Sequence, residues 1–249
     1  MVLLDSYYEK IVATQGIVEV WRYERLNTAG GGKRENESDE KGEYSEQNYR
    51  ARQRNRRNRI RQLISMNFDR GSKFLTLTFG KVDFDICDVK ACNKYFKKFI
   101  QRLRYRYPEL EYVSVVEFQK RGAVHYHMIC NLPFVKKKEL QEIWGAGFIK
   151  INAIDKVDNV GAYVIKYMCK DTEDKRLQGL KAYNCSKGLK KPAELCTWRA
   201  EDTEAWREIH ERLEKESPSY AATYESENAG KIEYRQYNFN RQHDNTSLT

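Results

Sequence analysis

The stretch AVHYHMIC, residues 123–130, places two histidines two positions apart. His125 and His127 are half of the four histidines in this chain of 249 residues. Residues two apart in a β-strand point to the same face of a sheet, so the two imidazoles project together if this segment is a strand. Two imidazoles and one nearby carboxylate can hold a divalent ion while leaving coordination positions open.

A carboxylate lies at the right distance before the histidines. Residues 120–122 read Lys-Arg-Gly, and a three-residue loop with glycine in the left-handed conformation is a common hairpin closure. This loop pairs Glu117 with His125, and directly opposed residues have Cβ atoms roughly 4.5–5.5 Å apart. We therefore predict a metal site formed by Glu117, His125 and His127. A loop of another length would turn Glu117 away, and hydrogen-bonded histidines on a polar sheet face are then the alternative.

The second candidate group is the stretch YVIKYMCK, residues 163–170. At helical spacing, one face carries two phenols, each followed three residues later by an ammonium: Tyr163, Lys166, Tyr167 and Lys170. The opposite face is apolar and suits packing against a sheet: Val164, Ile165, Met168 and Cys169. An amphipathic helix with purely structural tyrosines is the alternative interpretation.

Together the two groups suggest one chemistry. Tyrosine is a weak nucleophile at its usual pKa of about 10, but nearby cations favour the phenolate, and covalent catalysis by tyrosine is established chemistry. A metal ion can polarise a phosphodiester that such a phenolate attacks.

The elements that must position these residues follow one another closely. Alternating or helical apolar patterns predict four strands, at residues 73–80, 111–118, 123–130 and 148–152. The same patterns predict three helices, at residues 88–107, 136–147 and 157–171. Asp88 is the expected N-cap of the first of these helices, and Pro108 follows its end. The order β-α-β-β-α-β-α is the split βαβ, ferredoxin-like pattern of an α+β fold with an antiparallel sheet.

Charge indicates the partner. The formal net charge is +9, and the chain holds 17 tyrosines. A basic chain with interleaved aromatic rings suits nucleic acid. Seven arginines fall in one segment that can form a basic helix, and we predict that they contact a nucleic-acid backbone: Arg50, Arg52, Arg54, Arg56, Arg57, Arg59 and Arg61. A solvated helix face is the alternative.

Other classes are disfavoured. No stretch of 18 apolar residues is present, so we expect no membrane association. No C-x-x-C occurs among the six cysteines, which we interpret as reduced thiols in a cytoplasmic protein. We find no phosphate-binding P-loop.

We expect four segments. Residues 1–48 combine a strand-like start with a flexible polar insertion, and residues 49–72 form the basic helix. Residues 73–171 form the core that carries the candidate site. Residues 172–249 form a polar, partly helical extension, with a helix expected near residues 203–214 and no helicase domain.

These motifs resemble a known family. HYH is similar to the HUH motif of HUH endonucleases, FLTLTF resembles that family's first motif, and YVIKYMCK resembles its third motif in the form with two tyrosines. The order matches from about residue 73 to residue 170. AYNCSKGLKKP resembles a segment that follows the nuclease core in plasmid and phage replication proteins. The two-tyrosine form is found in rolling-circle replication initiators of small phages and related plasmids.

The resemblance implies a five-stranded antiparallel sheet with flanking helices and a site for Mg²⁺ or Mn²⁺ on His125, His127 and Glu117. It implies that Tyr163 or Tyr167 attacks single-stranded DNA at a replication origin, which can be a hairpin. The products are a 5′-phosphotyrosine and a free 3′-OH. Lys166 and Lys170 would orient the phosphate or stabilise the phenolate. Without a helicase domain, strand separation would depend on a host helicase or on supercoiling. A host helicase and polymerase are the expected partners, in the cytoplasm of a bacterial cell.

Two other interpretations stay open. A relaxase or a single-strand DNA transposase uses the same chemistry on other DNA. A non-enzymatic nucleic-acid-binding protein would use the histidines structurally and the tyrosines for stacking.

Overall fold

The computed structural model describes residues 6–28, 46–152, 154–168, 183–197, 204–226 and 229–241. The chain divides into two compact units, one formed by residues 44–191 and the other by residues 1–43 together with 192–249. Among the described residues, no helix combines the length and the apolar character needed to cross a membrane.

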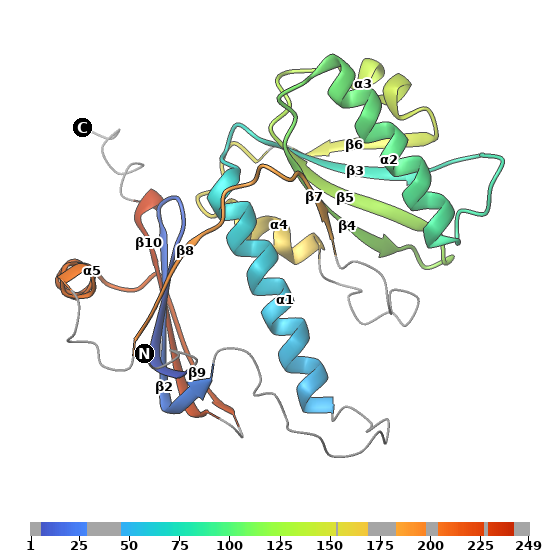
Figure 1. The fold of residues 1–249 in the computed structure, drawn as a ribbon. Helices are drawn as coiled ribbons and strands as arrows, with labels where there is room; N and C mark the ends of the chain where they lie inside the picture. Colours follow the sequence, from blue (N-terminus) through green and yellow to red (C-terminus); the bar gives the residue numbers. More distant parts are fainter. Residues whose placement is uncertain are drawn as a thin grey trace. The chain divides into compact units, whose positions relative to one another are not determined.

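The unit of residues 44–191 is built on an antiparallel sheet of five strands in the order β6-β3-β5-β4-β7 (Figure 1). Its strands are β3 (Lys73–Phe79), β4 (Tyr112–Phe118), β5 (Val124–Cys130), β6 (Gly147–Asn152) and β7 (Asn184–Cys185). This α+β architecture confirms the expected fold class. The short edge strand β7 lies in a segment for which the sequence patterns gave no strand.

Helices pack on both faces of this sheet (Figure 1). They are α1 (Glu46–Asn67), α2 (Val89–Arg106), α3 (Lys137–Trp144) and α4 (Val160–Met168). Alternation along β3 decides which side chain meets which helix. Leu75 and Leu77 join one buried cluster with residues of α2 and α3, whereas Phe74 joins a second cluster with residues of α1 and α4.

The boundaries of α2 follow from its sequence. The side chain of Asp88 accepts a hydrogen bond from the backbone N–H of Lys90 at 2.8 Å, which satisfies one of the free donors of the first turn. The helix stops at Arg106, two residues before Pro108. The predicted N-cap is therefore confirmed.

Helices α1 and α4 approach closely at Gly161. A Cβ atom at this position would meet the Ser65 hydroxyl and lie 2.6 Å from the backbone oxygen of Arg61. The buried side chains Ile60 and Ile64 of α1 share a cluster with Val164 of α4. The basic helix thus supports the helix that carries the two tyrosines.

The other unit is a second five-stranded sheet in the order β8-β1-β2-β10-β9. Its elements are β1 (Ser6–Ala13), β2 (Ile17–Thr28), β8 (Ala193–Thr197), α5 (Glu204–Glu214), β9 (Tyr220–Ser226), β10 (Gly230–Asn238) and the short 3₁₀ helix η2 (Phe239–Arg241). Helix α5 confirms the helix predicted near residues 203–214, and its Trp206 packs with Ile11 and Val20. The tyrosine-rich tail, to which the sequence patterns gave no structure, forms β9 and β10.

Candidate active site

The turn between β4 and β5 has the predicted form. Gly122 has a φ of 83°, the left-handed conformation that favours glycine. Its N–H donates to the backbone oxygen of Gln119 at 2.7 Å, and the N–H of Gln119 donates to the backbone oxygen of Ala123 at 2.9 Å. This closure pairs Glu117 directly with His125. The register predicted from three loop residues is confirmed.

Glu117, His125 and His127 converge on one point. The Nε2 atoms of both histidines contact the same carboxylate oxygen, Oε2 of Glu117, and the His125 contact is 3.0 Å. One ligand atom from each residue lies within 4.8 Å of the others. The side chains are largely enclosed, with exposed fractions of 15% for His125, 10% for His127 and 18% for Glu117.

The tyrosine of the HYH stretch points to the opposite face. Tyr126 is fully buried and its ring stacks on Phe96, with ring centroids 4.3 Å apart. Its hydroxyl donates to Oδ1 of Asn93 at 2.7 Å. Alternation in β5 therefore divides the three residues between the core and the candidate site.

The ionisation of Glu117 suits a metal ligand. Burial alone would raise the pKa of this carboxyl group, but hydrogen bonds from His125 and His127 outweigh burial and lower the pKa to about 2. The carboxylate is therefore negatively charged at neutral pH. One anionic oxygen and two imidazole nitrogens form a donor set that can hold a divalent metal ion, with further positions left for water or a phosphate oxygen.

Thr76 orients one of the imidazoles. Its hydroxyl lies 3.2 Å from Nδ1 of His127, on the side of the ring away from Glu117. A hydroxyl can donate or accept, so Thr76 can partner either tautomer of His127. With Nε2 facing a metal ion, Nδ1–H would donate to Thr76, an arrangement that fixes ring orientation in metal sites. Sequence analysis did not identify this residue, although the period of β3 places Thr76 and Thr78 on the histidine face.

We expect Thr76→Val to weaken Mn²⁺ binding by about 10- to 100-fold, the usual cost of losing a hydrogen bond to a metal-bound imidazole. Isothermal titration with Mn²⁺ measures this change. Thr78→Val is the matched control, because Thr78 pairs with His125 across the sheet and no hydrogen bond joins their side chains among the described residues. Equal losses in both variants would contradict a specific role for Thr76.

Helix α4 presents its tyrosines as the sequence predicts. Asn159 accepts a hydrogen bond from the N–H of Ala162 at 2.9 Å and so caps the start of the helix. The apolar side faces the core, with Val164, Ile165 and Met168 buried. Tyr167 is 38% exposed, Tyr163 is half-buried and Lys166 is exposed. Cys169 and Lys170 lie outside the described residues.

Phe74 joins the two candidate groups. Its ring stacks on His127 with centroids 5.7 Å apart, and it also contacts Tyr167 with centroids 5.9 Å apart. The rings of Tyr163 and Tyr167 are 5.3 Å apart. The tyrosine helix and the histidine strand thus meet over one buried aromatic residue, which sequence analysis did not single out.

The acidity of Tyr163 differs from the expectation. Its pKa is raised, first by a hydrogen bond to Tyr167, then by burial and by the charge of the neighbouring phenolate. Neighbouring lysines alone would have lowered it. The reason is geometric, since the second phenol contacts Tyr163 directly whereas Lys166 is exposed to solvent. Tyr163 is therefore protonated at neutral pH in the absence of a metal and DNA.

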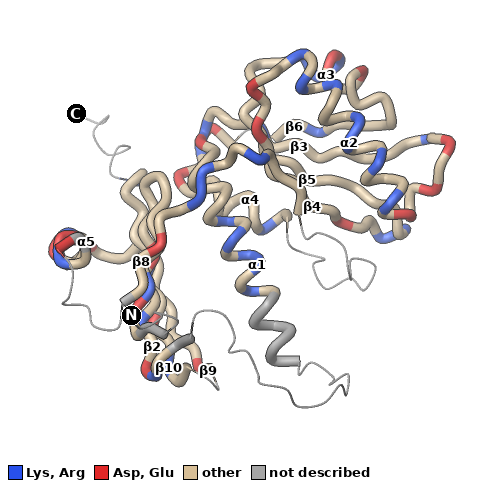
Figure 2. Tube along the Cα trace, in the orientation of Figure 1, with Lys and Arg blue, Asp and Glu red and all other residues tan. Residues whose placement is uncertain are grey.

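The basic helix supplies charge beside this face of the sheet (Figure 2). Arg54, Arg57 and Arg59 are exposed, whereas Arg56 and Arg61 are partly buried. Arg61 donates to Oδ1 of Asn58 at 3.2 Å. The side chains of Arg50 and Arg52 lie outside the described residues. Contact of these arginines with nucleic acid stays a prediction.

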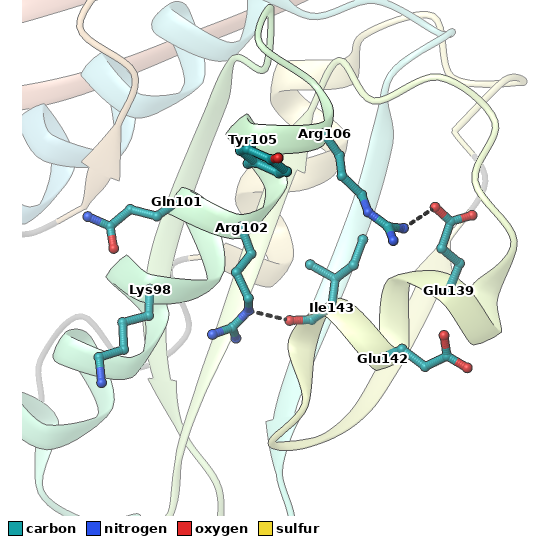
Figure 3. A pocket seen from close by; sticks show the side chains of 8 residues that line it. All are labelled: Lys98, Gln101, Arg102, Tyr105, Arg106, Glu139, Glu142 and Ile143. Carbon is teal, nitrogen blue, oxygen red and sulfur yellow. Dashed lines mark hydrogen bonds and ion pairs between the residues drawn. The ribbon is translucent and has the colours of Figure 1, made fainter.

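A surface hollow between α2 and α3 belongs to the other face of the sheet (Figure 3). The two arginines that line it join the helices. Arg102 donates to the backbone oxygen of Ile143 at 2.8 Å, and Arg106 donates to Glu139 at 2.6 Å. The hollow includes none of the candidate metal ligands or tyrosines, so the candidate site is the histidine face.

Comparison with known families singles out the same segment. Residues 72–172 match the family model of the replication-associated protein ORF2. The matched segment covers less than half of the chain and contains β3, the histidine hairpin and the tyrosine helix. Searches of curated proteins and of solved structures found no match.

Proposed function

We propose that this protein initiates rolling-circle replication by nicking and rejoining single-stranded DNA at an origin. The observation that carries the proposal is the meeting of two groups over Phe74. A carboxylate and two imidazoles converge on one side, and a pair of phenols lies on the other. Both groups fall within the segment that matches a replication-associated family.

The metal would be held by Glu117, His125 and His127. A bound Mg²⁺ or Mn²⁺ supplies a positive charge that polarises the scissile phosphodiester and stabilises charge on its oxygens. Thr76 keeps His127 oriented, and the low pKa of Glu117 keeps that ligand anionic without a proton to displace.

The nucleophile is a phenol of α4. Its oxygen forms a bond to phosphorus as the bond from phosphorus to the 3′ oxygen breaks. The phenol loses its proton, and the leaving oxygen gains one to become a free 3′-OH that primes synthesis. The 5′ phosphate stays on tyrosine, which preserves the bond energy for rejoining without ATP. Lys166 and Lys170 orient the phosphate or stabilise the phenolate.

Two phenols fit a repeated reaction. Tyr163 and Tyr167 lie one helical turn apart on the same face, with rings in contact. One can hold the 5′ end while the other cleaves the regenerated origin. A hydrogen bond joins the two phenols, and a negative charge on Tyr167 raises the pKa of Tyr163. Ionisation of one phenol therefore favours the protonated form of the other.

A covalent adduct tests the proposal. The purified chain is incubated with Mn²⁺ and single-stranded oligonucleotides that tile the DNA flanking its gene, each labelled at its 3′ or its 5′ end. On a denaturing gel, we expect a protein-linked band that carries only the 3′-end label, because the phosphotyrosine joins the downstream fragment. Absence of an adduct with every oligonucleotide would favour a protein that binds nucleic acid without cleaving it.

The same assay separates related activities. Adducts that form only with transfer-origin or transposon-end sequences would favour a relaxase or a single-strand transposase. Two tyrosines in the Y-x-x-K-Y-x-x-K arrangement favour the initiator.

A further inference from the structure

Strand β6 carries an exposed phenylalanine on the same face of the sheet as the candidate metal ligands. Phe148 is 67% exposed, although its neighbours Gly147 and Ile149 are half-buried and buried. Lys150, two residues further on, is also exposed. Large exposed aromatic side chains on a sheet surface are a recurring platform for unpaired bases.

The strand register places Phe148 in line with the site. Phe148 pairs with Thr78, Thr78 with His125, and His125 with Glu117. Directly paired residues share a face, so these four side chains form one row. The strands that carry them lie side by side in the order β6, β3, β5 and β4 (Figure 1). Adjacent strands lie about 4.8 Å apart, which puts the Phe148 backbone about 10 Å from that of His125.

A second row runs beside the first. Lys150 pairs with Thr76, Thr76 with His127, and His127 with Val115. Phe148 and Lys150 are two residues apart, about 6.7 Å along the strand. An aromatic ring and an ammonium group are therefore presented side by side, each level with one of the two histidines.

Both side chains are accessible within the part of the chain that is described. The buried cluster formed with α1 and α4 includes Phe74 and Val115 but not Phe148. Thr76 and Thr78 are half-buried. Their side chains are short, so they project little from the sheet between β6 and the histidines. Among the described residues, no carboxylate pairs with Lys150.

We propose that Phe148 and Lys150 form a nucleotide subsite, in which the ring stacks on a base and the ammonium contacts a backbone phosphate of the single-stranded substrate. The inference rests on the proposed function and adds a path for the DNA, across β3 from β6 to the metal ligands. Stacking tolerates any base, so the subsite holds the strand near the scissile phosphate, and sequence recognition lies elsewhere.

Binding of a fluorescent oligo(dT) strand by the full chain in EDTA tests the subsite without cleavage. We expect Phe148→Ala to weaken binding by about 5- to 150-fold, the range that loss of one stacked base gives. Phe148→Trp keeps an aromatic ring at this position and should bind oligo(dT) as tightly as the parent chain. The matched control is Phe134→Ala, because Phe134 is equally apolar, 86% exposed and outside both rows.

Lys150→Gln gives an independent measurement. A plot of the logarithm of the association constant against the logarithm of the salt concentration has a negative slope. Loss of one phosphate contact should make this slope less steep by about 0.7, the value for one counterion on a single strand. Unchanged oligo(dT) binding by Phe148→Ala, or an equal loss in Phe134→Ala, would overturn the subsite. So would an unchanged salt slope in Lys150→Gln.

These outcomes are separable from failure of the proposed function. If the chain forms adducts with origin DNA but its Phe148→Ala variant binds oligo(dT) as tightly as the parent, the proposed function is supported and the subsite is contradicted. If the chain binds oligo(dT) through Phe148 but forms no adduct, the subsite is supported and the proposed nicking activity is contradicted. Thermal unfolding of each variant confirms that the fold persists.

Discussion

We expect the double variant Tyr163→Phe/Tyr167→Phe to form no covalent adduct with DNA, while each single variant retains part of the activity. Phenylalanine keeps the ring and its contacts, including the packing of residue 167 on Phe74, but removes the only atom that can attack phosphorus. We expect either phenol to attack the same phosphate, because the two rings are in contact on one face of α4. The denaturing-gel assay with 3′-end-labelled oligonucleotides measures the adduct.

The single variants also report on the hydrogen bond between the phenols. Tyr167→Phe removes the partner that raises the pKa of Tyr163, so the pKa of Tyr163 should fall towards its ordinary value. Tyr105→Phe is the matched control, since Tyr105 is an 89% exposed tyrosine on α2 and should leave adduct formation unchanged. An adduct that persists in the double variant would show that the nucleophile lies elsewhere.

The sequence predicts those parts of the site that are positioned by residues close to them in the chain. The pairing of Glu117 with His125 follows from a short loop that ends in Gly122, so the sequence suffices. The face of α4 follows equally from helical periodicity. Thr76 and Phe74 could not be linked to the site in the same way, because no local pattern shows that β3 pairs with the second edge of β5.

The second sheet illustrates the same limit on the scale of the fold. Apolar alternation near residues 17–21 indicates a strand, and helical periodicity indicates α5. Pairing of β2 with β10 joins segments some two hundred residues apart, for example Trp21 with Tyr234. Such contacts are set by packing of the whole unit, so a strand-like start and a tyrosine-rich tail gave no sign that they form one sheet.

The largest effect of a single substitution is expected for His127→Ala, which removes one of the three candidate metal ligands and the ring that stacks on Phe74. Mn²⁺ binding should weaken by more than the loss expected for Thr76→Val. Nicking should slow by about 100-fold or more, since a metal contributes several kcal/mol to the transition state and each 1.4 kcal/mol is tenfold. Binding of uncleaved oligo(dT) in EDTA should change little, because no metal takes part in it.

Titration calorimetry with Mn²⁺ and single-turnover nicking of an origin oligonucleotide measure the two losses separately. The matched control is His210→Ala, since His210 lies on α5 in the other unit, where it contacts Glu9 at 2.9 Å. This control should bind Mn²⁺ and nick DNA like the parent chain. If His127→Ala still nicks at the parental rate with the same dependence on Mn²⁺, the convergence of His125, His127 and Glu117 is a hydrogen-bonded cluster and the metal is held by other residues.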